Sequence, residues 1–149
     1  MGKKIIAKNK RARFDYALDD AYEAGLVLQG TEVKSIRAGK VTIAESFITI
    51  DGNQEAWIYN MNIGHYEFGN IHNHEEGRKR KLLLNAKEIE EIYHRMKAES
   101  LTLVPTIIYF TNNRVKIEIA LGKGRKQYDK RQDKAKKDVE KKLRRGQYD

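Results

Sequence analysis

The chain has 149 residues, 40% of them hydrophobic, which predicts one domain with tails, and it has no cysteine, which excludes disulfides and thiolate metal sites. No stretch approaches the roughly 20 apolar residues that span a membrane, and no apolar run follows the basic N-terminus. We therefore expect a soluble cytoplasmic protein without a signal peptide. The net charge of +9 makes a polyanionic partner the first hypothesis.

The positive charge is concentrated at the two ends of the chain. Residues 1–13 hold six Lys or Arg and no acid, residues 14–122 hold twelve against sixteen Asp or Glu, and residues 123–149 hold twelve against five. We expect a body over 1–122, with a basic arm at 1–13, and a basic tail over 123–149. Such ends favour phosphate binding, because each neutralised phosphate releases counterions. The weaker alternatives are tails that only maintain solubility and a membrane-surface tail, which would need an apolar face.

The first half of the chain predicts four strands and one helix. The strand patterns cover 14–18, 21–29, 41–50 and 56–63. Asp19–Asp20 is expected to turn the chain between the first two strands, and Asp51-Gly52-Asn53 between the last two. A short helix is expected from an N-cap at Thr31 to Arg37, with Gly39 as its stop.

The second half begins with a polar loop at 64–77 and then predicts a helix and a hairpin. Asn85 with Glu88 three residues later is a capping-box pattern, and the spacing of the apolar residues carries an amphipathic helix to about residue 98. A strand at 101–110 contains the only proline, Pro105, which indicates an edge strand or a bulge. Asn112-Asn113 suits a two-residue turn into a return strand through 115–119, because Asn tolerates positive φ. Gly122 and Gly124 would loosen the exit into the tail.

This order of elements predicts a mostly β fold with two or three short helices. Six strand patterns and a closing hairpin favour a small closed or nearly closed antiparallel β-barrel. Among small barrels that bind polyanions, the oligonucleotide-binding (OB) fold is the leading expectation.

The tail carries a helical pattern of its own. Ala135, Val139 and Leu143 form an i, i+4, i+8 stripe, Asp129 is placed to cap a helix and Gly146 to end it. A helix with so narrow an apolar face is marginal in water. We expect a tail that is disordered when free and helical against a negatively charged partner.

No constellation in the chain predicts catalysis. His65, His72 and His74, with Glu75 and Glu76, lack a metal-ligand spacing, so we expect exposed histidines, no metal and no cofactor. The acids at 19–20 and 88–91 suit a turn and a helix N-terminus. No phosphate loop, nucleophile triad or dinucleotide fingerprint is present, and we expect a protein that is not an enzyme. The alternative is a metal-dependent nuclease, which would require the loop with His72 and His74 to bind a metal ion.

Basic clusters are the strongest functional signal. They are Lys8, Lys10, Arg11 and Arg13; Lys34, Arg37 and Lys40; residues 78–81; and Lys123, Arg125 and Lys126. Exposed tyrosines could stack on unpaired bases, the candidates being Tyr16, Tyr22, Tyr59 and Tyr128. Structured RNA is favoured over duplex DNA, because no helix-turn-helix or zinc signature is present.

Several motifs along the chain resemble those of the SsrA-binding protein (SmpB) family. They are GLVLQGTEVKSIRAGK at 25–40, AKNKR at 7–11 with Tyr16, RKLLLN at 80–85, and LGKG at 121–124 followed by DKR at 129–131. The resemblance implies an OB-type barrel that binds the tRNA-like domain of transfer-messenger RNA and brings it to stalled ribosomes. It implies a tail in the decoding centre and empty mRNA channel. From the residues themselves we expect no membrane or DNA partner, and nothing in the sequence argues against a monomer. A basic-tailed ribosomal or ribosome-assembly protein is the runner-up.

The resemblance and the basic clusters together select the candidate site residues. For the RNA-binding face they are Asn9, Lys10, Arg11, Tyr16, Glu23, Glu32, Lys34, Arg37, Lys40, Leu83, Lys116 and Lys123. For the decoding centre and mRNA channel they are Lys126, Tyr128, Asp129, Lys130, Arg131, Lys134, Lys137, Lys141 and Arg144. Tyr128 stands where relatives often carry His. A carboxylate such as Glu23 or Glu32 can accept from cytosine or guanine amino groups, the alternative being a pair with a nearby cation.

Overall fold

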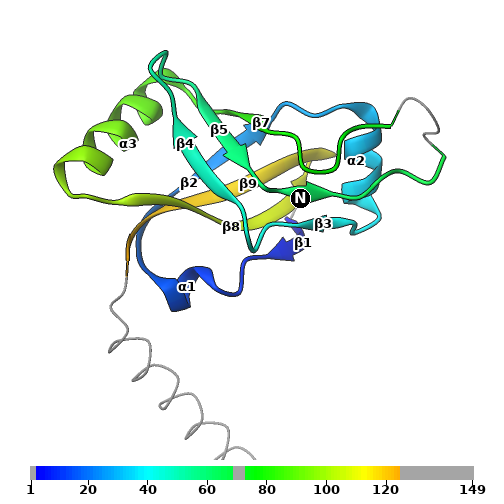
Figure 1. Ribbon diagram of the computed structural model, residues 1–149, viewed down its shortest axis with the longest axis horizontal. Coiled ribbons are helices and arrows are strands. Elements are labelled where there is room, and N and C mark those ends of the chain that lie inside the picture. The colour runs from blue at the N-terminus through cyan, green and yellow to red at the C-terminus, as the bar shows by residue number, and fades with distance from the viewer. Residues whose placement is uncertain (1–2, 69–72, 125–149) are drawn as a thin grey trace, which may run out of the picture.

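The structure, a computed structural model, describes residues 3–68 and 73–124 (Figure 1). Within these residues the fold is mostly β, with three helices. The strands are β1 Lys4–Lys8, β2 Tyr16–Leu26, β3 Val41–Thr42, β4 Phe47–Ile50, β5 Ala56–Tyr59, β6 Asn62–Ile63, β7 Arg80–Leu83, β8 Thr102–Thr111 and β9 Arg114–Gly124. The helices are α1 Ala12–Asp15, α2 Gly30–Arg37 and α3 Ala86–Ala98.

Seven strands form one antiparallel sheet in the order β1-β8-β9-β2-β7-β5-β4, and β3 pairs with β6 separately. Strand β4 also contacts β8, and Figure 1 shows it crossing in front of that strand. Among the described residues no backbone ladder joins β1 to β4. The mostly β architecture is therefore confirmed, whereas the expected closure of a barrel is not seen as a continuous hydrogen-bonded sheet.

The core lies on the inward side of this sheet. Alternate residues of β9 and β8 point into it, among them Ile117 and Ile108, and β5 contributes Ile58, all fully buried. Helix α3 adds Ile92, and α2 adds Ile36. Helices α3 and α2 lie at opposite ends of the sheet in Figure 1, and the short helix α1 contacts β2 and β8.

The region expected to be two strands with a turn at Asp19–Asp20 is one strand, β2. Its pairing with β9 shifts register between Leu18 and Ala21, so the two aspartates lie at a bulge and not at a turn. Arg95 on α3 donates to both carboxylates, at 2.8 Å for Asp19 and 2.7 Å for Asp20. This long-range ion pair explains why two adjacent acids are tolerated inside a strand. The strand expected at 14–18 is also wrong at its start, because residues up to Asp15 form α1.

Two other predicted strands are each divided in the structure. The 41–50 segment splits into β3 and β4 around a turn in which the Ser46 hydroxyl donates to the Ile43 carbonyl. The 56–63 segment splits into β5 and β6 at Asn60, whose φ of 59° no regular strand accommodates. The strands are therefore shorter than expected, and the small β3–β6 pair leaves the main sheet.

The predictions of local turn and cap chemistry are confirmed at the start of α3 and at the β8–β9 turn, but the predicted cap of α2 is wrong. Asn85 accepts from the backbone N–H of Glu88 at 3.0 Å and opens α3. Asn112 and Asn113 have φ of 50° and 62° at the β8–β9 turn. Pro105 lies at a bulge, but β8 runs between β1 and β9 and is not an edge strand. Helix α2 is capped by Gln29, not Thr31, in a capping box with Glu32.

Strand β9 continues through Gly124, two residues beyond the expected end of the body, so Gly122 and Gly124 do not loosen the exit. No described helix is long and apolar enough to cross a membrane. The predicted tail helix lies outside the described residues, as do the following candidates: His72, Lys126, Tyr128, Asp129, Lys130, Arg131, Lys134, Lys137, Lys141 and Arg144.

Candidate nucleic-acid interface

One row of side chains crosses the outward face of the sheet. The register places Leu83 of β7 opposite Gly25 of β2, Gly25 opposite Lys116 of β9, and Lys116 opposite Tyr109 of β8. Gly25 leaves a gap in this row, since a Cβ there would lie 3.4 Å from the Leu83 Cβ and 3.7 Å from the Lys116 Nζ. The gap belongs to an open groove between a half-exposed leucine and an ammonium group.

The neighbouring row carries two carboxylates. Glu23 of β2 lies directly opposite Glu118 of β9, an arrangement that costs free energy through like-charge repulsion. Each carboxylate is held by a hydroxyl donor on β8: Tyr109 donates to Glu23, and Thr106 donates to Glu118 at 2.6 Å. Burial raises the pKa of Tyr109, and the neighbouring glutamates raise it further, so its hydroxyl stays protonated.

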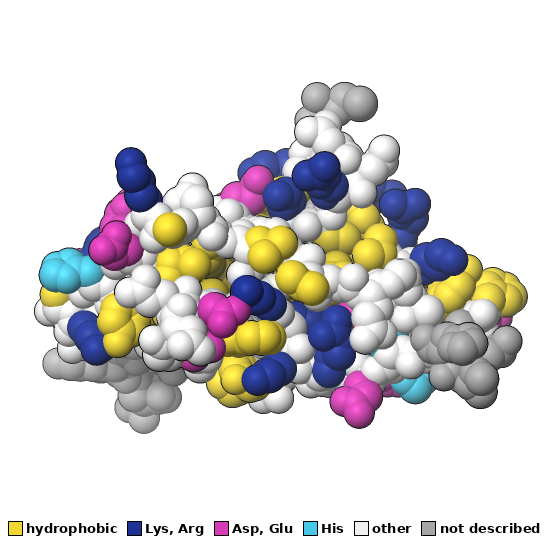
Figure 2. Space-filling model, turned by 90° about the horizontal axis from the view of Figure 1, so that it is seen from above, with side chains coloured by type: hydrophobic (Ala, Val, Ile, Leu, Met, Phe, Trp, Pro, Cys, Tyr) yellow, Lys and Arg dark blue, Asp and Glu magenta, His cyan; other side chains and the backbone are white. Residues whose placement is uncertain are grey.

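Helix α2 and Lys40, three residues after its end, extend the positive charge beyond the sheet. Lys34, Arg37 and Lys40 are all exposed, as expected. The Lys34 Nζ lies 5.2 Å from the ring centroid of Tyr66, and the Arg37 guanidinium lies 5.3 Å from that of Phe110 at the end of β8. On the face seen in Figure 2, Lys and Arg side chains lie among exposed hydrophobic ones, the mixture that phosphates and unpaired bases together require.

Glu32, expected to be a candidate base contact, is buried and lies below this surface. Its side chain is fully buried, and its carboxylate accepts from Arg78, from the Gln29 backbone at 2.8 Å and from the Arg80 Nε at 2.7 Å. Burial alone would raise the pKa of Glu32, but the hydrogen bonds from Arg78, Gln29 and Arg80 outweigh it and hold this pKa below its ordinary value. The alternative interpretation, a pair with nearby cations, is the one that the geometry supports.

Arg80 was expected in a basic surface cluster, and it is fully buried as well. Besides Glu32 it binds the Met61 carbonyl and those of Glu75 and Glu76, at 3.2 and 3.1 Å. It thus joins β7, α2 and the segment before β7. The partner of a buried arginine cannot be read from a run of basic letters, because burial depends on residues far away in the sequence.

The histidines divide between surface and interior. His65 is exposed, as expected, but His74 is buried, with its ring nitrogens 2.8 Å from the Thr31 hydroxyl and 2.8 Å from the Ile63 carbonyl. His74 therefore fastens its segment to the start of α2. Within the described ranges no group of three His, Cys, Asp or Glu side chains is placed to hold a metal ion.

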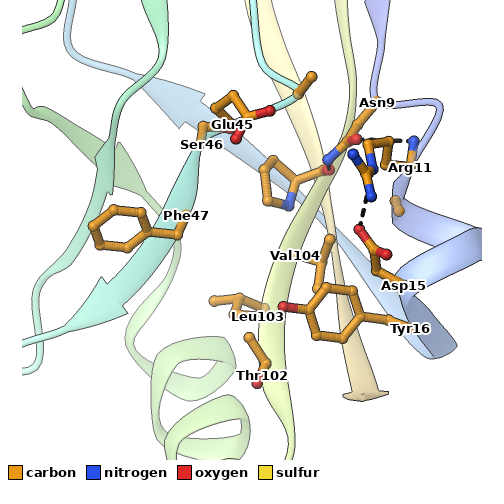
Figure 3. Close-up of a pocket in the computed structure, with 13 residues that line it drawn as sticks. Asn9, Arg11, Asp15, Tyr16, Glu45, Ser46, Phe47, Thr102, Leu103 and Val104 are labelled. Carbon is orange, nitrogen blue, oxygen red and sulfur yellow. Dashed lines mark hydrogen bonds and ion pairs between the residues drawn. The ribbon is translucent and has the colours of Figure 1, made fainter. Parts of the chain in front are cut away.

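Asn9, Arg11 and Tyr16 lie together at a second location, a pocket beside α1 (Figure 3). The Asn9 amide donates to the Pro105 carbonyl at 2.9 Å and so fixes the end of β1 to the bulge of β8. Tyr16 packs across Gly122, where a Cβ would lie 3.0 Å from the Tyr16 Cβ. In Figure 3 its ring lies beside the wall formed by β8. These residues are at the opposite end of β2 from Gly25.

Other basic and aromatic candidates are dispersed. Lys10 lines a third hollow, which also includes Glu118, and Lys123 is exposed opposite Ala17. The Tyr22 hydroxyl donates to Glu91 at 2.9 Å, and Tyr59 stacks on Phe47 with ring centroids 5.1 Å apart, so both side chains have partners within the protein.

Tyr109, Glu118 and Gly25 were not predicted as parts of the site. The alternation through 115–119 indicated that Glu118 points outward, and Gly25 opens the motif at 25–40, but no sequence pattern indicated Tyr109.

An antiparallel sheet whose outward face combines cations, an exposed leucine and oriented carboxylates is typical of nucleic-acid-binding proteins. The particular family follows from comparison with known proteins. The chain belongs to the SmpB family, since the family model "SmpB protein" matches residues 6–148.

Named relatives and a solved structure agree with this assignment. The "SsrA-binding protein" of Halothermothrix orenii is 49% identical over 142 residues, which cover 95% of this chain and 91% of that protein. The "SsrA-binding protein" of Bifidobacterium adolescentis is 53% identical over 131 residues, covering 88% and 82%. A chain from the structure described as "tmRNA-SmpB: a journey to the center of the bacterial ribosome" matches with a TM-score of 0.66 and 42% identity, covering 81% of this chain and 85% of that chain.

Proposed function

We propose that this protein binds the tRNA-like domain of transfer-messenger RNA and delivers it to stalled bacterial ribosomes, as a non-enzymatic factor of trans-translation in the cytoplasm. Family membership supports the proposal, as does the match to a structure whose description names both tmRNA and the ribosome. The observation that carries it is geometric. Glu23, Leu83 and Lys116 come from three strands and lie in two adjacent rows on one open face.

The face has the groups that recognition of a folded RNA requires. Lys116 and the cations of α2 supply charge for phosphates, which positions the RNA without reading its sequence. Leu83, with 52% of its surface exposed, and the groove at Gly25 offer an apolar contact for an unstacked base. Glu23 adds an acceptor for base amino groups.

We further propose that the sheet is an OB-type barrel. The contact between β4 and β8, which brings the two parts of the sheet together, supports this proposal. In this proposal the RNA-binding body extends to Gly124, where β9 ends, and the residues after it form the tail. Lys126, Tyr128, Asp129, Lys130 and Arg131 would act at the decoding centre. Lys134, Lys137, Lys141 and Arg144 would follow in the mRNA channel as a helix.

The experiment that tests the proposal measures binding to a transfer-messenger RNA transcript and to an elongator tRNA across a salt series. The protein should prefer the former, and Lys116→Ala should weaken binding and lower the salt slope by about 0.7–0.9, the value for one lost phosphate contact. Lys87→Ala on α3 is the matched control and should change neither quantity. Equal affinity for both RNAs, with ribosomal particles bound more tightly than either, would favour a ribosome-assembly protein instead.

A further inference from the structure

Tyr109 has an unusual position for a residue on the outward face. Its Cα is on β8, β9 lies between β8 and β2, and its hydroxyl nevertheless reaches Glu23 on β2. The side chain must therefore extend across β9, between Lys116 and Glu118. Lys3 covers the ring, with the Nζ 4.7 Å from its centroid, and only 2% of the residue is exposed. Tyr109 is thus not accessible to RNA, but its hydroxyl binds Glu23, which is exposed and accessible to RNA.

Glu23 needs such a partner because of what lies beside it. Glu118 is its direct cross-strand neighbour, and two facing carboxylates repel each other. Without a donor, the exposed Glu23 side chain would turn toward solvent or toward the ammonium of Lys116. The Tyr109 hydroxyl occupies Oε2 and leaves Oε1 with no hydrogen bond from any described residue. Thr106 holds Glu118 separately, through that residue's own Oε2.

We infer that Tyr109 is a positioning residue for RNA recognition, fixing the Glu23 carboxylate so that Oε1 accepts a hydrogen bond from the amino edge of an unpaired base. The inference rests on the proposed function, since it takes Glu23 to be an RNA contact. A carboxylate accepts from the amino groups of guanine and cytosine, so an oriented one discriminates bases while the lysines around it bind phosphate. Preorganisation of this kind gains affinity by removing the entropy cost of fixing the side chain on binding.

The test is a double-mutant cycle on affinity for full-length transfer-messenger RNA. Tyr109→Phe keeps the ring and removes only the hydroxyl, and it should weaken binding about three- to tenfold, the factor for immobilising one freed side chain. Glu23→Ala should weaken binding at least as much. In the Glu23→Ala background, Tyr109→Phe should change affinity by less than about twofold, because coupled residues are not additive.

Tyr22→Phe provides a matched control. It removes another tyrosine hydroxyl that donates to a glutamate, at 2.9 Å to Glu91, but at the side of β2 that faces α3. Its RNA affinity should equal that of the wild type. Glu23→Asp is the second variant, which keeps the charge but is too short for the same reach. It should bind weakly whether residue 109 is Tyr or Phe.

The outcomes separate the inference from the proposed function. Wild-type affinity for Tyr109→Phe, or an equal loss from Tyr109→Phe with and without Glu23, overturns the positioning role. If Glu23→Ala binds normally while Lys116→Ala binds weakly, the inference fails and the proposed function stands. Failure of the wild-type protein to distinguish transfer-messenger RNA from elongator tRNA overturns both.

Discussion

Replacing Glu32 by Gln should destabilise the protein strongly although it leaves the RNA-facing surface unchanged. The substitution removes the carboxylate that pairs with the fully buried guanidinium of Arg80. It also sets an amide N–H₂ group against the arginine donors or against the Gln29 N–H. Removing one member of a buried ion pair costs about 3–5 kcal/mol, because a charge is left uncompensated in the interior. That is a large part of the stability of a typical domain.

The assay is urea unfolding at pH 7 followed by far-ultraviolet circular dichroism. The matched control is Glu55→Gln, which breaks a half-exposed pair with Lys81 and should cost no more than about 1 kcal/mol. If the two variants lose the same free energy of unfolding, the buried network does not have the role described.

The contribution of Glu32 also has a defined pH dependence. Its folded pKa is lowered, so its contribution is present above the unfolded-state pKa of about 4.3 and disappears as the pH falls through the folded value.

Three further predictions concern the β8–β9 hairpin and the tail that follows it. Gly122→Ala places a Cβ 3.0 Å from that of Tyr16 and should cost about 1–3 kcal/mol in urea unfolding, as overpacking does; an unchanged midpoint would mean that Tyr16 moves freely. Asn113→Val, at φ 62°, should cost about 1–2 kcal/mol while Asn113→Gly is neutral or stabilising, and the reverse order of midpoints would contradict the turn geometry. Deleting residues 130–149 should keep affinity for transfer-messenger RNA within a few-fold yet abolish peptide tagging in a reconstituted translation system. Loss of RNA affinity on truncation would refute the separation of body and tail.

The sequence predicted well those features whose cause is local. The capping box at Asn85 and the positive φ at Asn112 and Asn113 depend on a few neighbouring residues, and both are present. The strand face of β9 follows from alternation alone. The turn predicted at Asp19–Asp20 was wrong, because the compensating charge of Arg95 lies 75 residues along the chain from Asp20. A turn and a bulge have the same local composition.

The structure brings three of the predicted site residues onto one face of the sheet and buries another that was expected on the surface. Motif resemblance named Glu23, Leu83 and Lys116, and the register brings them together. The same reasoning placed Glu32 on the surface, because charged residues are rarely buried unless they are paired. Its partner Arg80 is 48 residues distant. Tyr109 was missed for a related reason, since its link to Glu23 crosses an intervening strand that only the sheet order reveals.

Lysine footprinting can show whether the outward face of β2, β7 and β9 binds transfer-messenger RNA. The free and RNA-bound proteins would be acetylated briefly and the modified lysines quantified by mass spectrometry. RNA should protect Lys34 on α2 and Lys116 on β9, while Lys87 and Lys97 on α3 react as before. Protection of the α3 lysines with Lys116 unchanged would contradict binding at this face.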